Sequence, residues 1–293
     1  NVYDLWLNEV NYMYPHQGAF LCNQGPYIPG IRYIKMNESE YDIVHFSEDR
    51  STADRDRAMK RYIGARYFLE HTNLKWYWCA SDDNFINLDK IDAMAFDLEH
   101  NYDTENDYVY KGHCAYTLTY RQHYLQGGIG YIYSRKAAQK FVDEGMEYLK
   151  NTKGPDDVVF NRYFGLFGLT VRQTSTRYMF GHGDRIPFLD HDYINNSINE
   201  CPNETARPYT ECYGKEIYPL NDFIALHESN TANGILRFNF IMNASKRYNN
   251  LYYYYDDMSM YVCKANYTNI TSIVSIYEKK IQSLSRKNHR ALY

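Results

Sequence analysis

A short apolar strand that ends in two adjacent acids constrains this chain more than any other feature. The run from Trp76 to Cys79 is aromatic and apolar, and Asp82 and Asp83 follow closely. Apolar side chains can be buried along a strand, but two neighbouring carboxylates cannot be buried without partners. We therefore expect the acids at the carboxyl end of the strand, where open α/β sheets bind ligands. They suit a hard cation such as Mg²⁺ or Mn²⁺, although a strand-end turn with solvated acids fits this run equally well.

A second segment combines glycines with a strand and a helix start. Three glycines lie within residues 127–130, where they let the backbone turn sharply or approach a ligand closely. The apolar residues of 131–133 predict a strand. Ser134 is a typical N-cap for a helix that we expect to end near Leu149.

A third segment places two acids at the start of a helix. Pro155 precedes a helical pattern, and Asp156 and Asp157 occupy its first turn, where the helix dipole favours negative charge. The two acids therefore serve either as simple first-turn residues or as functional groups that the helix presents.

Helical and strand-like patterns alternate along the chain, which favours a mostly parallel sheet with helices on both faces. The stretch from Asn249 to Asp257 is too polar for a core and fits a loop, an edge strand or a disordered segment. Helices are expected near 4–10, 52–71, 89–100, 135–149 and 156–165, and strands near 18–22, 30–35, 41–46, 76–79 and 108–111.

Composition narrows the function classes. The 293 residues suffice for one large domain or two small ones. A net charge of −4 gives no electrostatic basis for binding nucleic acid. No apolar stretch reaches the roughly 18 residues that span a bilayer. The 33 tyrosines suit both a core and a carbohydrate-binding surface, because each joins a large apolar area to a polar tip.

Cysteines and glycosylation sequons point to the secretory pathway. Six cysteines permit up to three disulfides, and we expect Cys201 to pair with Cys212 in a loop-rich stretch. Cys79 lies within the predicted strand and fits a plain buried thiol. Six Asn-X-Ser/Thr sequons exceed chance modestly, although an Asn-rich genome also produces them. They begin at Asn37, Asn195, Asn203, Asn243, Asn266 and Asn269.

Together and in this order, the three segments resemble the inverting β1,3-glycosyltransferases that include Fringe and the core 1 galactosyltransferase. Residues 76–87 resemble the family's aromatic strand and three-acid metal motif. Residues 127–136 resemble its glycine-rich block, and residues 155–157 its Pro-Asp-Asp or Glu-Asp block. The resemblance implies an α/β fold of the GT-A-like (nucleotide-diphospho-sugar transferase) type, with a mostly parallel sheet flanked by helices.

The resemblance extends from about Val2 to about Met242. It implies a glycosyltransferase catalytic domain over residues 1–242 and a C-terminal extension of unclear structure over 243–293. The strand that precedes the first helix in the family is not among these residues. We therefore expect a trimmed chain, a truncated gene model or an incomplete uridine pocket.

The implied reaction moves a hexose or N-acetylhexosamine from a UDP-sugar to a glycan hydroxyl, with inversion and a β1,3 linkage. Mn²⁺ or Mg²⁺ would offset the charge that develops on the diphosphate, and a general base would activate the acceptor hydroxyl. The partners would be a UDP-sugar donor and a glycan or glycoprotein acceptor. The location would be the lumen of the Golgi or endoplasmic reticulum, with a type II membrane anchor outside this chain, or a secreted form. The alternative is a catalytically inactive relative that acts as a chaperone or scaffold.

The resemblance also implies roles for the acids. Asp83 matches the direct metal ligand of the family, and Asp82 matches a residue that contacts the ribose or supports the metal. Ser81 replaces the first acid of the motif, and this departure favours the inactive alternative. Asp157 matches the general base, with Asp156 as the second candidate.

A metal site with a single carboxylate needs a further ligand, and two histidines qualify. His227 resembles the histidine that follows an apolar strand in the core 1 enzyme, and His182 resembles one in the Phe-His-Ser-His motif of Fringe. We expect only one of them to bind metal, and a hydrogen-bonded structural role is the alternative for each.

Glycines and basic residues complete the predicted site. Gly127 and Gly128 would line the donor-sugar pocket, where a side chain would collide with the sugar, unless the turn needs glycine for a positive φ. Lys60 and Arg61 lie near a lysine position of the family, so either could pair with the diphosphate. A solvated helix face is the simpler interpretation of each.

Overall fold

The computed structural model describes residues 20–22, 33–35, 50–80, 84–117, 119–169, 179–182, 189–202, 218–227, 232–256 and 259–265. The strands are β1 (Phe20–Cys22), β2 (Tyr33–Lys35), β3 (Trp76–Cys79), β4 (Asn84–Ile86), β5 (Tyr110–Gly112), β6 (Cys114–Thr117), β7 (Gln122–Leu125), β8 (Tyr131–Ser134), β9 (Met179–His182), β10 (Tyr218–Pro219), β11 (Ala225–His227), β12 (Leu251–Asp256) and β13 (Ser259–Lys264). The helices are α3 (Arg50–His71), α4 (Leu88–Asn101), α5 (Arg135–Asn151), α6 (Asp156–Gly165), α8 (His191–Asn196), α9 (Ala232–Arg247) and the 3₁₀ helix η2 (Leu220–Asp222).

The locally encoded helices form where the sequence predicts them. α3, α4, α5 and α6 match the four predicted helices between residues 52 and 165 to within two residues at each end. Ser134 caps α5, because its side chain accepts a hydrogen bond of 3.2 Å from the backbone amide of Ala137. The predicted helix at 4–10 and strand at 41–46 lie outside the described residues.

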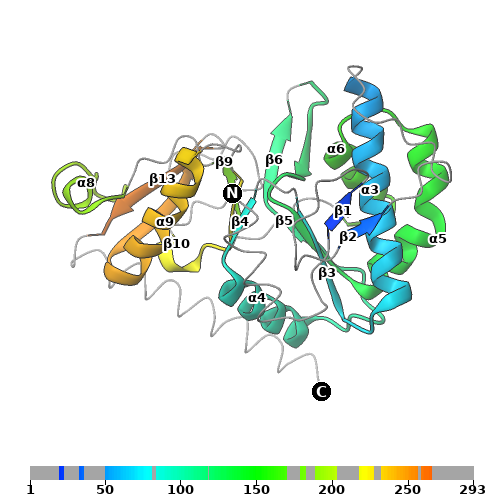
Figure 1. Ribbon diagram of the computed structural model, residues 1–293, viewed down its shortest axis with the longest axis horizontal. Helices are drawn as coiled ribbons and strands as arrows, with labels where there is room; N and C mark the ends of the chain where they lie inside the picture. The colour runs from blue at the N-terminus through cyan, green and yellow to red at the C-terminus, as the bar shows by residue number, and fades with distance from the viewer. Residues whose placement is uncertain are drawn as a thin grey trace.

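The larger core lies between one antiparallel sheet and three helices. β8 pairs with β3 on one side and with β5 on the other. α3 packs against both α5 and α6, and these helices gather beside the sheet on the right of Figure 1. The largest fully buried side chains of this core are aromatic: Tyr110, Tyr131, Tyr133, Tyr163, Phe141, Phe160 and Phe164.

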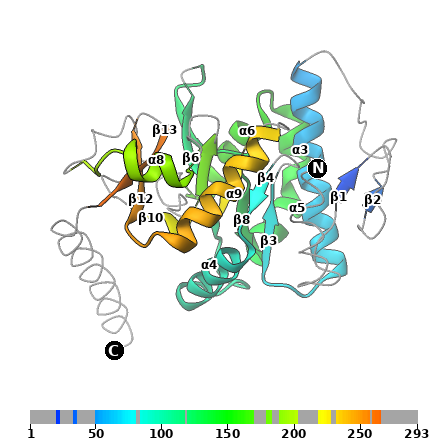
Figure 2. The ribbon, with the colours of Figure 1, turned by 60° about the vertical axis from the view of Figure 1, so that its left-hand side comes forward.

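A second sheet joins this region to the C-terminal part. β11 lies between β4, to which it runs antiparallel, and β9, to which it runs parallel. The backbone amide of Asn87 donates to the carbonyl of Ile224 at 2.7 Å. Ile224 also shares a small core with Ile129 and Ile132 of the β8 region. In Figure 1, β4 and β9 lie in the middle of the molecule, between α8 and α9 on one side and α3, α5 and α6 on the other, and Figure 2 also shows β4 between α9 and α3.

The described strand pairs are mixed in direction. β1–β2 and β9–β11 are parallel, and the pairs of β8, β12 and the β6–β7 hairpin are antiparallel. The GT-A-like architecture with a mostly parallel sheet stays a prediction.

The C-terminal tyrosine-rich stretch is a central strand, which corrects the expectation of a loop, edge strand or disordered segment. β12 pairs with both β10 and β13. Leu251 and Tyr253 are buried in a core that also contains Ala244 of α9, whereas Tyr252 is buried on the other face. Each tyrosine ring supplies apolar area to the core, although the hydroxyl group makes tyrosine count as a polar residue in the sequence. The predicted boundary at residue 242 falls inside α9.

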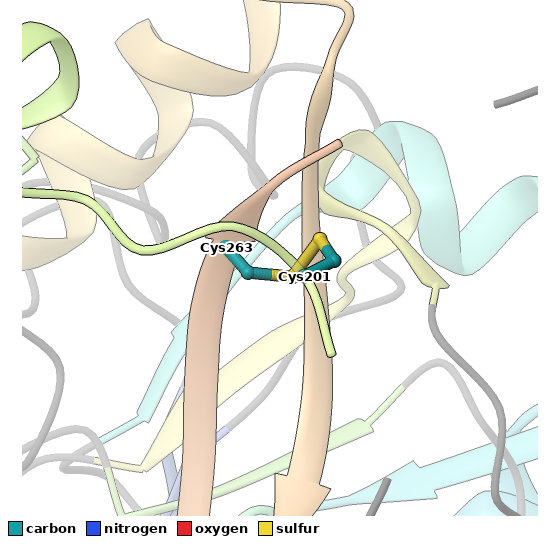
Figure 3. Close-up of a disulfide and its surroundings, with 2 residues drawn as sticks. All are labelled: Cys201 and Cys263. Atoms are coloured by element: carbon teal, nitrogen blue, oxygen red, sulfur yellow. A yellow bond between two sulfur atoms is a disulfide. The ribbon is translucent and has the colours of Figure 1, made fainter. Parts of the chain in front are cut away.

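The disulfide of this region differs from the predicted one. Cys201 bonds to Cys263 of β13, not to Cys212 (Figure 3). The cause is backbone pairing, since Cys201 donates to the carbonyl of Lys264 at 3.0 Å and brings the two cysteines together. Cys114 is also disulfide-bonded, and Cys79 is a free thiol that is partly exposed. Among the described residues, no helix is both long and apolar enough to cross a membrane.

Candidate functional site

Two adjacent glycines lie between the predicted base and the predicted metal ligand. A Cβ placed on Gly127 would lie 2.6 Å from Nη2 of Arg61 and 3.1 Å from Cβ of Asp157. A Cβ placed on Gly128 would lie 2.4 Å from Cε1 and 2.5 Å from Nε2 of His227. The structure thus brings these side chains from α3, α6 and β11 to a single turn before β8.

The need for glycine at these two positions is spatial. Neither Gly127 nor Gly128 has a positive φ, so the turn itself does not demand glycine there. Gly130 does have a positive φ, of 101°, and a Cβ on it would meet the carbonyl oxygen of Cys79 at 2.5 Å. The three glycines lie close together in sequence but are needed for different reasons: Gly127 and Gly128 leave space for neighbouring side chains, and Gly130 adopts a positive φ.

Asp156 and Arg61 form a buried ion pair. Nε of Arg61 lies 2.5 Å from Oδ2 of Asp156, and both side chains are 9% exposed. Arg57, one turn earlier on α3, reaches Oδ1 of Asp156 at 3.5 Å from the surface. Since its carboxylate is committed to these arginines, Asp156 is a structural partner, and Arg61 is not available to a diphosphate.

Asp157 has a different environment from its neighbour. Its Oδ1 accepts from the amide of Val158 at 2.8 Å, and its Oδ2 accepts from the amide of Gly127 at 3.3 Å. The residue is only partly buried. Burial, reinforced by the charge of Asp156, raises the pKa of Asp157 to about 6, while the two backbone amides and Arg61 oppose the rise. A carboxylate with such a pKa can accept a proton near neutral pH.

The two candidate histidines are neighbours across β9 and β11. His227 is opposite His182 in the parallel register, and a register shift between the strands gives β9 one extra residue. Such a bulge changes which residue faces the partner strand. His227 is also opposite Asn84, the first residue of β4, on its other side.

Asn84 fixes the glycine turn to β4. Its Nδ2 donates to the carbonyls of Gly128 and Ile129, at 2.6 Å and 2.5 Å. Within the described part of the chain, the Oδ1 atom of this fully buried side chain has no hydrogen-bond partner. Buried polar atoms normally have partners, so this oxygen is a candidate ligand contact.

Several predicted site residues are not brought to the turn by the described structure. Ser81, Asp82 and Asp83 lie outside the described residues, directly before Asn84 in sequence. Lys60 is partly exposed on α3. Among the described residues alone, no three His, Cys, Asp or Glu side chains form a group that could hold a metal ion.

Sequence reasoning missed two residues of this site. The sequence assigns Arg61 either to a diphosphate or to a solvated helix face, whereas the structure buries it. The sequence gives Asn84 no role beyond its place in the motif of residues 76–87. Arg61 lies on the buried face of α3 with Ala58 and Ala65, and this spacing is the only signal that pointed inward. Asn84 carried no signal beyond its position next to the acids.

Comparison with known proteins gives two partial similarities, and no family model matches the chain. Over 132 residues, the chain is 27% identical to Transcription factor E of Methanosphaera stadtmanae. This match covers 44% of this chain and 72% of that protein. Over 120 residues, it is 31% identical to Glycoprotein-N-acetylgalactosamine 3-beta-galactosyltransferase 1 of Xenopus laevis, which covers 39% of this chain. That second match spans 31% of the galactosyltransferase.

Proposed function

We propose that this protein is a metal-dependent inverting glycosyltransferase that moves a hexose or N-acetylhexosamine from a UDP-sugar to a glycan hydroxyl, forming a β1,3 linkage. The observation that carries the proposal is the convergence of Asp157 and His227 on adjacent glycines. The partial similarity to a 3-β-galactosyltransferase supports the same reaction class. The similarity to a transcription factor carries no proposal, because no feature of the described site points to transcription.

Asp157 is the proposed general base. It is partly exposed, has a pKa of about 6, and lies next to the glycine turn. A base with this pKa is largely ionised at neutral pH and still binds the acceptor proton well. Asp156 cannot take this role, since its carboxylate is buried against Arg61.

The proposed cation site lies on the other side of the turn. Asp83 directly precedes Asn84 in the sequence, and Asn84 is opposite His227 in the register, which supports Asp83 and His227 as ligands of one cation. Oδ1 of Asn84, which has no hydrogen-bond partner among the described residues, adds an oxygen donor to this edge. A carboxylate, an amide oxygen and an imidazole fit Mn²⁺, whereas Mg²⁺ prefers oxygen ligands alone. Bound there, the cation would neutralise charge on the leaving diphosphate.

The remaining predicted residues complete the donor site in this proposal. Ser81 and Asp82 would contact the nucleotide, and the backbone of Gly128 would lie against the donor sugar. Lys60 would approach the diphosphate from the partly exposed side of α3. One of the two histidines, His227 or His182, would be the imidazole ligand of the cation.

The same proposal includes the fold and the cellular setting. A GT-A-like domain would act in the Golgi or endoplasmic reticulum lumen on a glycan or glycoprotein acceptor. The Cys201–Cys263 disulfide supports an oxidising compartment. The sequon residues Asn195 and Asn243 are exposed on α8 and α9, as glycan acceptors must be.

Turnover measurements test the proposal. The purified chain would be incubated with Mn²⁺ and a panel of UDP-sugars, and released UDP would be measured with and without glycan acceptors. We expect release with at least one donor, and we expect Asp157→Asn to lower kcat by 10² to 10⁴, because a positioned base contributes about that much.

Asp97→Asn is the matched control, because Asp97 is an exposed residue of α4 that the proposal gives no role. It should leave turnover unchanged. UDP binding without release from any donor would favour the inactive relative, for which the serine at position 81 is the supporting observation.

A further inference from the structure

We propose that Arg61 is a positioning residue of this site, which locks the start of α6 to the glycine turn and thereby fixes where Asp157 points. The inference rests on the proposed function, since it concerns the orientation of the proposed base. Arg61 itself reaches neither substrate nor metal in this account.

The guanidinium of Arg61 connects three separate segments. Nε binds Asp156 of α6 at 2.5 Å, Nη2 donates to the carbonyl of Gly127 at 3.1 Å, and Nη1 donates to Sγ of Cys79 at 3.3 Å. The group also lies over the ring of Tyr131, 4.9 Å from its centroid. A planar fork of five donors can make these contacts at once, whereas a lysine ammonium is a single point charge.

The connection to Asp157 runs through two routes. Asp157 follows Asp156 in the chain, so the ion pair fixes the first turn of α6. Gly127 accepts from Arg61 through its carbonyl and donates to Asp157 through its amide. Displacement of Arg61 would therefore move the base and the turn together.

The buried location argues against a purely stabilising role. Counted over the whole residue, Arg61 is 8% exposed and Asp156 is 6% exposed. Buried ion pairs are often no more stabilising than apolar residues of similar volume, because both charges lose their hydration. The three contacts of Arg61 suggest instead that it holds α6 and the glycine turn in one fixed arrangement.

The positioning role of Arg61 can be tested through the pKa of Asp157, which depends on the charges around it. It is faced by Asp156 from its own helix, Arg61 from α3, Tyr124 from β7 and Tyr110 from β5. Burial raises the pKa of Asp157 most, the charge of Asp156 raises it further, and the charge of Arg61 lowers it. Removing these two charges should therefore shift the titration of Asp157 in opposite directions.

The experiment titrates Asp157 by ¹³C NMR of aspartate carboxyl groups, with the Asp157→Asn spectrum subtracted to identify the signal. We expect Asp156→Asn to lower the midpoint by about one unit, and Arg61→Gln added to that variant to raise it again. Arg61→Lys keeps the charge, so the midpoint should stay within about half a unit of wild type while kcat falls about tenfold or more and KM for the donor is unchanged.

Arg66→Gln is the matched control on the same helix. Arg66 is partly exposed and pairs with Glu70 of its own helix at 3.6 Å, so its loss should change neither the midpoint nor kcat measurably. Wild-type kcat in Arg61→Lys would overturn the proposal, as would midpoints of the Asp156→Asn and double variants that move in the same direction. Absence of turnover in the wild type would instead contradict the proposed function, and the titrations would still show whether Arg61 controls Asp157.

Discussion

At the scale of single residues, two glycines are fixed by side chains distant in sequence. Gly127 leaves room for Arg61, 66 residues away, and Gly128 leaves room for His227. The sequence could predict that glycine was needed near residue 127. It could not predict which side chains required glycine there, because local patterns do not encode contacts with distant residues such as Arg61 and His227.

Gly128→Ala tests this packing directly. The added methyl group would collide with the imidazole of His227, so we expect a loss of about 1–3 kcal/mol in unfolding free energy. We also expect the affinity for Mn²⁺ to fall about tenfold or more, because the ring must move. Urea unfolding and metal titration measure the two effects.

Gly165→Ala is the control for that substitution. A Cβ on Gly165 would meet no atom within 4 Å at the end of α6, so alanine should be neutral or slightly stabilising. Equal losses in both variants would show that Gly128 has no special relation to His227.

Asp157 makes stability depend on pH in a direction opposite to that of an ion-paired acid. Its pKa of about 6 lies above the usual value near 4, so the folded state holds the proton more tightly than the unfolded state. Stability contributed by that proton is present below pH 4 and is lost as pH rises through 6. We expect Asp157→Asn to raise stability at pH 7 by about 1–2 kcal/mol, allowing for partial exposure, with no gain at pH 4.

Urea unfolding at both pH values measures this difference. A variant that loses turnover but gains stability at pH 7 would mark Asp157 as a residue kept for function. An equal loss of stability at pH 4 and pH 7 would contradict the assigned pKa.

At the scale of elements, α6 shows what sequence can and cannot supply. Its start at Pro155 and its two acids in the first turn followed from local preferences. Local preferences could not predict that Asp156 is buried and Asp157 partly exposed. Successive residues of a helix point about 100° apart, and only the packing of α3 decides which one is buried. Lys60 and Arg61 differ for the same reason.

The strand pairings and the disulfide were the least predictable features. The sequence predicts a loop, edge strand or disordered segment where β12 forms, because the stretch is polar in composition, yet the strand is central and its residues Leu251, Tyr252 and Tyr253 are buried. Cys201 was paired with the cysteine nearer in sequence, whereas β13 brings Cys263 next to it. Both errors concern contacts between distant residues, which local patterns do not report.

The disulfide should stabilise the C-terminal sheet. Cys201 and Cys263 close a loop across 62 residues, so replacing both with serine should lower the unfolding free energy by about 2–4 kcal/mol. Non-reducing peptide mapping identifies the pair, and urea unfolding measures the loss. Cys79→Ser is the control, since Cys79 is a free thiol. A peptide linking Cys201 to Cys212 would contradict the structure.

At the scale of the whole molecule, β11 joins the parts of the site. It shares a core with the β8 region, pairs with β4 directly after the predicted metal motif, and ends at His227. The sequence predicted both acid pairs and both histidines as separate motifs. Of these residues, the described structure brings Asp157 and His227 to one turn, and His227 reaches it because β11 lies beside strands that are far away in the chain.

We propose that Asp83, His227 and the glycine turn form one site for a cation and UDP, and calorimetry measures the binding of both. Heats of UDP binding would be measured with and without Mn²⁺ for the wild type, Asp83→Ala and His227→Ala, with the exposed His191→Ala as the control. We expect Mn²⁺-dependent binding in the wild type and His191→Ala, and a loss of about tenfold or more in each of the other variants. Equal affinities in all four proteins, or binding that does not depend on Mn²⁺, would contradict the account.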